Sequence, residues 1–122
     1  MPADTNSNGD IFGGWLMSQM DIAGGMLAKE VMQGRCATVA ADAFKFIRPV
    51  NVGDIVCCFG QVKQVGTTSM TVGLEVWVKR QHEPADSEYV LVTAADFTYV
   101  AIDDTGAKRE FPKTDRRLSK FK

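Results

Sequence analysis

The sequence predicts an α+β protein in which an antiparallel sheet packs against one long helix. Two observations carry this prediction. Residues 14–33 space their apolar side chains as a helix does, and most of the chain after residue 35 has the composition and alternation of β-strands. A length of 122 residues corresponds to one domain that can bury its own core. We place that domain at residues 1–112 and expect the basic residues 113–122 to form a solvated, flexible tail.

The helix is predicted from apolar residues that recur at intervals of three and four. They are Trp15, Leu16, Met20, Ala23, Met26, Leu27 and Val31. Gly34 follows directly and provides a C-terminal stop, whereas residues 1–10 are rich in residues that form loops. At about 1.5 Å per residue, such a helix spans roughly 30 Å.

Four strands are expected after the helix, at residues 36–47, 55–65, 68–79 and 89–102. The first ends at Arg48-Pro49, because proline cannot donate to a sheet. Alternation is strongest at 69–78, and polar turns at 81–87 and 103–106 separate the later segments. The helix is the available cover for the apolar face of this sheet, which is the architecture called hotdog. An uncovered sheet edge also favours pairing between subunits, so we expect a homo-oligomer.

Composition excludes several classes of protein. A net charge of -1 gives no reason to expect a nucleic-acid partner. Three cysteines, Cys36 and the adjacent Cys57 and Cys58, are too few and too poorly placed for a disulfide scaffold, and we interpret them as buried thiols. No apolar stretch approaches the roughly 18–20 residues of a membrane span, and no signal peptide is evident. We therefore expect a cytoplasmic protein without a membrane partner.

Four segments resemble YciA-like acyl-CoA thioesterases, a family of hotdog-fold acyl-CoA hydrolases. They are N-S-N-G-D-I-F-G-G-W-L-M-S-Q-M-D-I-A-G-G at 6–25, F-K-F-I-R-P-V at 44–50, V-G-D-I-V-C-C at 52–58 and L-E-V-W-V-K-R at 74–80. They occur in order and together cover nearly the whole chain. Members of this family usually carry one more N-terminal strand, and the present sequence begins after that point.

Asp21 is the residue that we expect to carry the chemistry. A carboxylate beside the apolar stripe is costly to bury unless it is paired or used, although a surface position on the helix is an equally good interpretation from the pattern alone. In the family that the chain resembles, the aspartate of S-Q-M-D is the catalytic carboxylate. The resemblance thus implies that Asp21 is a general base for water or a direct nucleophile, and the sequence does not separate the two.

The start of the helix offers two further candidates for catalysis. Unpaired backbone N–H groups at a helix N-terminus can hold a developing oxyanion, and Gly13 and Gly14 would let a thioester carbonyl approach closely. The alternative is that these glycines only shape the turn into the helix. Related thioesterases place an Asn or Asp at the position of Asp10 to orient the attacking water, often from the partner subunit. Asp10 could equally cap the helix.

Coenzyme A needs groups that bind its phosphates and its pantetheine arm. The candidates are Arg48, Thr67, Thr68, Ser69, Lys79 and Arg80. Arginine favours phosphate through its fork geometry, and the turn at 66–69 offers hydroxyls and amides. Each cation, taken singly, is more often a solvated surface charge.

The single histidine excludes rival chemistries. His82 lies in a polar turn, and the chain has no Gly-x-Ser-x-Gly motif, so a Ser-His-Asp hydrolase is not expected. Hotdog dehydratases need a histidine near the helix, and a metal site needs more His and Cys than this chain offers. The sequence therefore predicts an acyl-CoA thioesterase without a metal or cofactor. The resemblance implies a dimer as minimal unit, assembled as a trimer of dimers, with a broad acyl range and a role in fatty acid metabolism. The alternatives are a non-catalytic acyl-CoA binding or sensing module and a purely structural oligomer.

Overall fold

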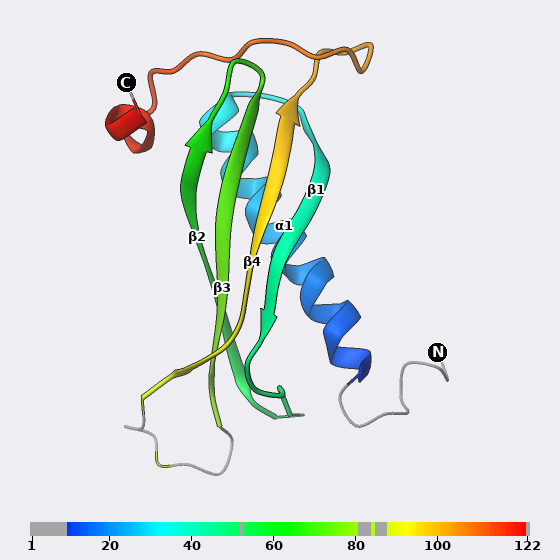
Figure 1. Ribbon diagram of the computed structural model, residues 1–122, viewed down its shortest axis with the longest axis vertical. Coiled ribbons are helices and arrows are strands. Elements are labelled where there is room, and N and C mark those ends of the chain that lie inside the picture. The colour runs from blue at the N-terminus through cyan, green and yellow to red at the C-terminus, as the bar shows by residue number, and fades with distance from the viewer. Residues whose placement is uncertain (1–9, 52, 81–83, 85–87, 122) are drawn as a thin grey trace.

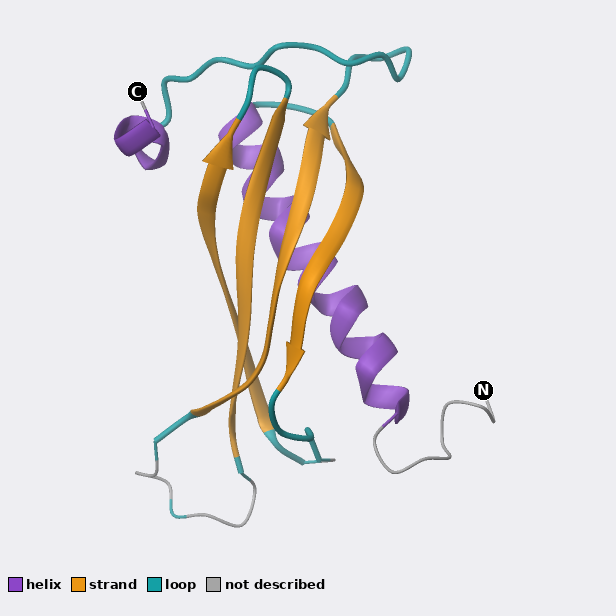
Figure 2. Ribbon diagram, in the orientation of Figure 1, coloured by secondary structure: helices purple, strands orange, loops and turns teal. Residues whose placement is uncertain are grey.

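The computed structural model describes residues 10–51, 53–80, 84 and 88–121, with side chains from Gly13 onward. Its elements are the helix α1 (Asp10–Met32), the strands β1 (Cys36–Phe46), β2 (Ile55–Val65), β3 (Ser69–Lys79) and β4 (Val90–Ala101), and a 3-10 helix, η2 (Arg116–Phe121). The strands form one antiparallel sheet in the order β1-β4-β3-β2. Helix α1 lies across one face of this sheet (Figures 1 and 2). The predicted α+β architecture is confirmed.

The strands form where the alternation of side chains predicts them. Along β3, Met70, Val72, Leu74, Val76 and Val78 are buried, and the residues between them are not. Because successive side chains of a strand point to opposite faces, these five all face α1. Their partners on β4 continue the same apolar surface, with Met70 opposite Tyr99 and Val72 opposite Phe97.

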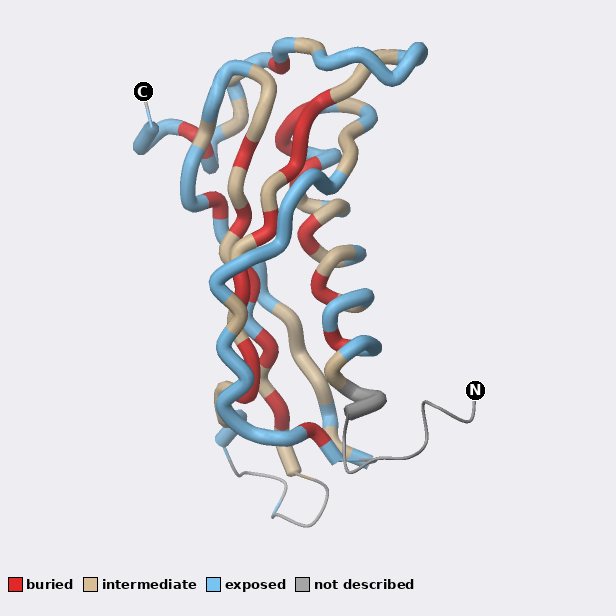
Figure 3. The backbone as a smooth tube through the Cα atoms, turned by 45° about the vertical axis from the view of Figure 1, so that its right-hand side comes forward, coloured by how far each residue is buried: buried red, intermediate tan, exposed pale blue. Residues whose placement is uncertain are grey.

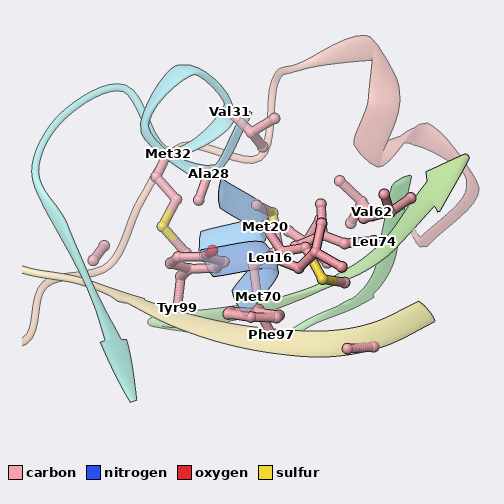
Figure 4. Packing of buried hydrophobic residues seen from close by; sticks show 14 of the residues in the cluster. Leu16, Met20, Ala28, Val31, Met32, Val62, Met70, Leu74, Phe97 and Tyr99 are labelled. Carbon is pink, nitrogen blue, oxygen red and sulfur yellow. The ribbon is translucent and has the colours of Figure 1, made fainter. Parts of the chain in front are cut away.

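The core lies between α1 and the sheet, and α1 contributes Leu16, Met20, Ala28, Val31 and Met32 to it (Figure 4). Figure 3 shows that the buried stretches of α1 are turned towards the strands. Two members of the predicted stripe lie outside the core: Trp15 is 44% exposed and Met26 is 69% exposed. Together with Ile22 they occupy a different side of α1, since positions seven and four apart share a helix face. The predicted stripe was too wide for a helix that packs on a single sheet.

Helix α1 begins four residues earlier than the predicted residue 14 and ends at Met32. Gln33 adopts the left-handed conformation, with φ of 57°, and the Gly34 N–H then bonds the Lys29 carbonyl oxygen at 3.1 Å. This hydrogen bond satisfies one of the last carbonyl groups of the helix, as in a Schellman ending.

The C-terminal segment packs against the domain, whereas the sequence predicts a flexible tail. Leu118 is 1% exposed, and η2 contacts β2. Lys113 lies over the ring of Phe111 and donates to the carbonyl oxygen of Thr67 at 3.1 Å. Arg117 bonds Asp115 at 2.7 Å and Glu30 of α1 at 2.6 Å. The buried Leu118 side chain and the ion pairs of Arg117 hold this short basic segment against the domain.

Docking of this segment should weaken in acid. Hydrogen bonds from the Arg117 side chain and backbone N–H lower the pKa of Asp115 to about 2. The unfolded value is about 3.9, so the stabilisation is present above that value and is lost as the pH falls towards about 2. We expect the Leu118 methyl resonances to keep their packed shifts at about pH 5 and to lose them in that window. In Asp115→Asn protein this step should be missing, and the same transition in both proteins would contradict the prediction.

Candidate active site

Asp21 lies in the middle of α1, half-buried, and one of its carboxylate oxygens is held by two hydroxyl groups. The Thr38 hydroxyl donates to Oδ1 at 2.7 Å from β1, and the Tyr99 hydroxyl approaches the same atom at 3.1 Å from β4. No described residue donates a hydrogen bond to Oδ2. The carboxylate is therefore fixed through one oxygen, and the other is available to accept a proton or to attack an electrophile.

Tyr99 is the buried member of this group, with 1% of its surface exposed. Its burial raises the pKa of the hydroxyl, and the neighbouring Asp21 carboxylate raises it further. The hydroxyl therefore stays protonated at neutral pH, as a donor to a carboxylate must. It also lies 3.0 Å from the Asp21 carbonyl oxygen, so it contacts both the backbone and the side chain of this residue.

Gly24 allows α1 to approach Tyr99. A β-carbon at this position would lie 2.9 Å from Leu74 Cδ1 and still closer to the Tyr99 hydroxyl. The next residue, Gly25, has room, because its β-carbon would lie 3.8 Å from the ring of Tyr99. The contact between Asp21 and Tyr99 thus depends on a glycine three residues along the helix.

Alanine substitutions at these two glycines should therefore have opposite effects. In Gly24→Ala, overpacking of a filled core costs about 1–3 kcal/mol, which outweighs the helix preference of alanine over glycine, about 1 kcal/mol at most. In Gly25→Ala, the helix preference acts alone and should raise the free energy of unfolding. Urea unfolding of both variants measures this difference. Equal stabilisation by the two substitutions would show that α1 does not lie this close to Tyr99.

A groove of about 410 Å³ opens beside Asp21, between α1 and the β1 edge of the sheet. Its lining includes Ile22 and Met26 from α1, Thr38 from β1 and Tyr99 from β4. Lys29 and Arg35 add two cations to the same groove. The groove thus combines an acceptor oxygen, apolar surface and positive charge, which is the combination that an anionic substrate with an apolar group requires.

Gly13 and Gly14 lie within the first turns of α1, because the helix begins at Asp10. A β-carbon on either glycine would meet no described atom within 4 Å, so packing against the described residues does not require a glycine at either position. Eight residues separate Gly13 from Asp21, or about 12 Å along the axis at 1.5 Å per residue. The amides near Gly13 and the carboxylate of Asp21 therefore cannot act on one carbonyl from within a single chain.

The candidates for binding coenzyme A divide between the two ends of the sheet. Arg48 follows β1, Lys79 is the last residue of β3 and Arg80 comes directly after it; all three lie at the end of the sheet where β2 begins. Thr67, Thr68 and Ser69 form the turn at the other end, eleven residues of β3 away, or about 36 Å. The structure does not bring the two groups together within one chain.

Hydrogen bonds within the chain already engage several of these candidates. Arg80 pairs with the buried Asp54 at 2.6 Å and donates to the Pro49 carbonyl oxygen at 2.9 Å. Arg48 donates to the Leu91 carbonyl oxygen at 2.7 Å. The Lys79 side chain makes no ion pair or hydrogen bond with any residue that the structure describes. Within that part of the chain, Lys79 is therefore the one of these three cations whose side chain is available to a phosphate.

The backbone of the 66–69 turn also has structural roles. The Gly66 N–H bonds the Ser69 carbonyl oxygen at 2.8 Å, and the Thr68 carbonyl oxygen accepts from Ala101 at 2.8 Å. The side chain of Asp10, the remaining predicted site residue, lies outside the described residues, as does His82, for which no role in the site was predicted. Sequence reasoning did not identify Thr38, Tyr99 or Lys29. For Tyr99 a signal was available, because the hydroxyl of a tyrosine in a buried strand needs a hydrogen-bond partner.

Comparison with known proteins identifies the family. The model of the thioesterase superfamily matches residues 8–85. The chain belongs to this superfamily. The acyl-CoA thioester hydrolase YciA of Escherichia coli (strain K12) is 56% identical over 113 residues, which cover 92% of this chain and 85% of that protein.

Solved structures of thioesterases agree with this assignment. A hexameric broad-specificity acyl-coenzyme A thioesterase is 50% identical, with a TM-score of 0.82 over 98% of this chain and 82% of that one. A hexameric hotdog-fold thioesterase of Campylobacter jejuni is 38% identical, with a TM-score of 0.81 over 99% of this chain and 89% of that one. The fold of this thioesterase-superfamily chain is therefore the predicted hotdog.

Two negative findings apply to the part of the chain that the structure describes. No helix there is both long and apolar enough to span a membrane. No three His, Cys, Asp or Glu side chains in the same residues lie close enough together to hold a metal ion.

Proposed function

We propose that the protein hydrolyses the thioester bond of acyl-CoA, releasing the free acid and coenzyme A, with Asp21 as the reacting carboxylate. The observation that carries this proposal is the state of Asp21: Oδ1 is held by Thr38 and Tyr99, while no described residue donates to Oδ2 beside the groove. The names of the related enzymes supply the class of substrate.

Asp21 can serve in either of two ways. As a general base, Oδ2 takes a proton from water while the water oxygen attacks the thioester carbonyl carbon. As a nucleophile, Oδ2 attacks that carbon itself and forms an anhydride, which water then cleaves. In both routes the C–S bond breaks and the sulfur leaves as the thiolate of coenzyme A, which takes up a proton. Neither route requires a metal or a bound cofactor.

In either route the thioester carbonyl oxygen becomes an oxyanion. Hydrogen-bond donors must then lie close to the carbon that is attacked. The helix start at Gly13 lies about 12 Å along α1 from Asp21 of the same chain, so we assign the donors to the helix start of a second subunit. The open space at Gly13 and Gly14 agrees with close approach by a substrate from outside the chain. Asp10, at the first residue of the same helix, would then lie near the attacking water.

Apolar side chains on the surface of a single chain support such an assembly. Ile22 and Met26 of α1 are 57% and 69% exposed, and Val39 of the edge strand β1 is 57% exposed. Exposed apolar side chains beside an unpaired strand edge favour contact with a second copy. We propose a dimer as the minimal unit, and a trimer of dimers in line with the hexamers named among the related structures.

Binding of coenzyme A is assigned to Lys79, together with Lys29 and Arg35 at the groove. The other candidates are Arg48, Arg80 and the turn residues Thr67, Thr68 and Ser69. A phosphate bound by these residues would add contacts to the hydrogen bonds described above. We place the reaction in the cytoplasm, with a broad range of acyl groups.

Release of coenzyme A tests the proposed function. The purified protein is incubated with acyl-CoA, and the new thiol is titrated with a thiol-reactive dye. We expect turnover that is linear in enzyme concentration. Binding of acyl-CoA without release of thiol would instead support a non-catalytic acyl-CoA binding protein.

A further inference from the structure

Strand β2 lies at an edge of the sheet and has a sequence that favours pairing. It hydrogen-bonds to β3 on one side, and no described strand lies on its other side. Residues 55–62, I-V-C-C-F-G-Q-V, carry no charge and no proline. An uncharged segment of β-forming residues at a sheet edge can pair with the same segment of a second molecule. We therefore searched the structure for a feature that prevents this pairing.

The 3-10 helix η2 lies beside the unpaired edge of β2. In Figure 1 it stands on the outer side of this strand, away from β3, and the two elements are in contact. A groove of about 360 Å³ between them is lined by residues 60–62 of β2, by Leu27 of α1 and by residues of η2. An added strand would have to lie where η2 is.

Three contacts fix the segment that carries η2. Lys113 donates to the carbonyl oxygen of Thr67, in the turn that follows β2, and Arg117 pairs with Glu30 of α1. Leu118 is 1% exposed. The ion pair is open to solvent and contributes little, so burial of Leu118 is the main reason that η2 stays beside β2.

The geometry of a symmetric β2 pair shows what η2 blocks. Strand β2 runs from residue 55 to residue 65, so two copies that pair antiparallel over their full length bring residue 60 of each copy together. Residue 62 then lies opposite residue 58 of the second copy. Because η2 lies beside residues 60–62, it occupies the space that residues 58–60 of the second copy need. The same clash recurs at the other η2 by symmetry.

We propose that η2 keeps the β2 edge closed to a second copy of this chain, so that copies assemble through other surfaces. Charge acts in the same direction. Arg116 and Lys120 place positive charge beside the edge, and like charges on two copies repel each other. The inference does not rest on the proposed function, because no step of it involves acyl-CoA.

Leu118→Asp in the full-length protein is the direct test. A carboxylate cannot remain in the buried position of Leu118 without a partner, so η2 should leave β2. Light scattering should then show a molar mass at least about twice that of the parent. In the larger species, hydrogen exchange of the outward-pointing amides in residues 55–62 should slow about tenfold or more, because these amides gain partners.

Two further variants show whether the effect belongs to Leu118. Phe121→Asp is the matched control, because Phe121 belongs to the same 3-10 helix but is 36% exposed. It should keep the molar mass and the hydrogen exchange of the parent. Leu118→Ala introduces no charge and should give the larger species in a smaller fraction of the protein.

A charge placed on the edge itself should reverse the effect of Leu118→Asp. Phe59 lies on β2 and is 58% exposed. A lysine on an edge strand opposes pairing, so Phe59→Lys added to Leu118→Asp should restore the molar mass of the parent.

Trypsin cleavage after Arg116 and Arg117 reports separately whether η2 has left β2. The inference is overturned if cleavage becomes fast in Leu118→Asp while the molar mass stays that of the parent. It is also overturned if the mass rises without slower exchange in β2, or if Phe121→Asp acts as Leu118→Asp does. Should Leu118→Asp unfold, the same measurements on Leu118→Ala decide.

Discussion

Replacing Asp21 by asparagine is expected to lower kcat for acyl-CoA hydrolysis about a thousandfold, within the range by which a positioned general base accelerates a reaction. Asparagine keeps the shape of the side chain and an oxygen that can still accept from Thr38 and Tyr99. Its amide nitrogen replaces the second oxygen and cannot take a proton from water or attack a carbonyl. The variant should therefore remain folded and bind acyl-CoA, which unfolding temperature and calorimetric titration would measure beside kcat.

Asp42→Asn is the matched control for this substitution. Asp42 is an exposed aspartate of β1 that pairs with Asp96, so it lies on the sheet face away from α1. The same chemical change there should leave kcat within about twofold of the parent, since a surface carboxylate contributes little outside the site. Equal losses in the two variants would indicate a general effect of charge.

Replacing Tyr99 by phenylalanine is expected to lower kcat about tenfold and the free energy of unfolding by about 1 kcal/mol, the usual value for one buried hydrogen bond. The hydroxyl contacts both Oδ1 and the carbonyl oxygen of Asp21, so its loss lets the carboxylate rotate. Tyr99 is a positioning residue, because it acts through Asp21. The loss should therefore appear in kcat, with KM nearly unchanged.

Tyr89→Phe provides the control for Tyr99. Tyr89 is 38% exposed, and the group that faces its hydroxyl is the Cys57 thiol, whereas Tyr99 faces a carboxylate. Its removal should leave kcat within about twofold of the parent. If Tyr99→Phe lost stability but kept its kcat, the hydroxyl would have only a structural role.

The strands could be predicted from the sequence because alternation is a local signal. Each predicted strand agrees with the observed one to within one residue at either end, and the dense alternation of β3 also identifies the buried face. Two properties depend instead on contacts with residues that are distant in the sequence. They are the burial of the apolar helix residues and the packing of the C-terminal segment. Trp15 and Met26 are apolar at helical spacing, yet no described strand covers them. Leu118 is buried through contacts with β2, which its basic neighbours in sequence do not indicate.

The candidate site was predictable in part for the same reason. Asp21 stands in a contiguous motif, whereas the groups that hold it come from positions 17 and 78 residues away. Whether a cation is free is also a property of the tertiary structure. Arg80 and Lys79 are neighbours in sequence, but only Arg80 lies beside the carboxylate of Asp54.

Asp21 is proposed to be the residue with which this thioesterase cleaves acyl-CoA. The most direct measurement is the rate of thiol release from a panel of substrates, from acetyl-CoA to palmitoyl-CoA, by the parent and by Asp21→Asn protein at equal concentration. We predict turnover of several substrates by the parent and almost none by the folded variant. Release at the same rate from both proteins would contradict the assignment of the chemistry to Asp21.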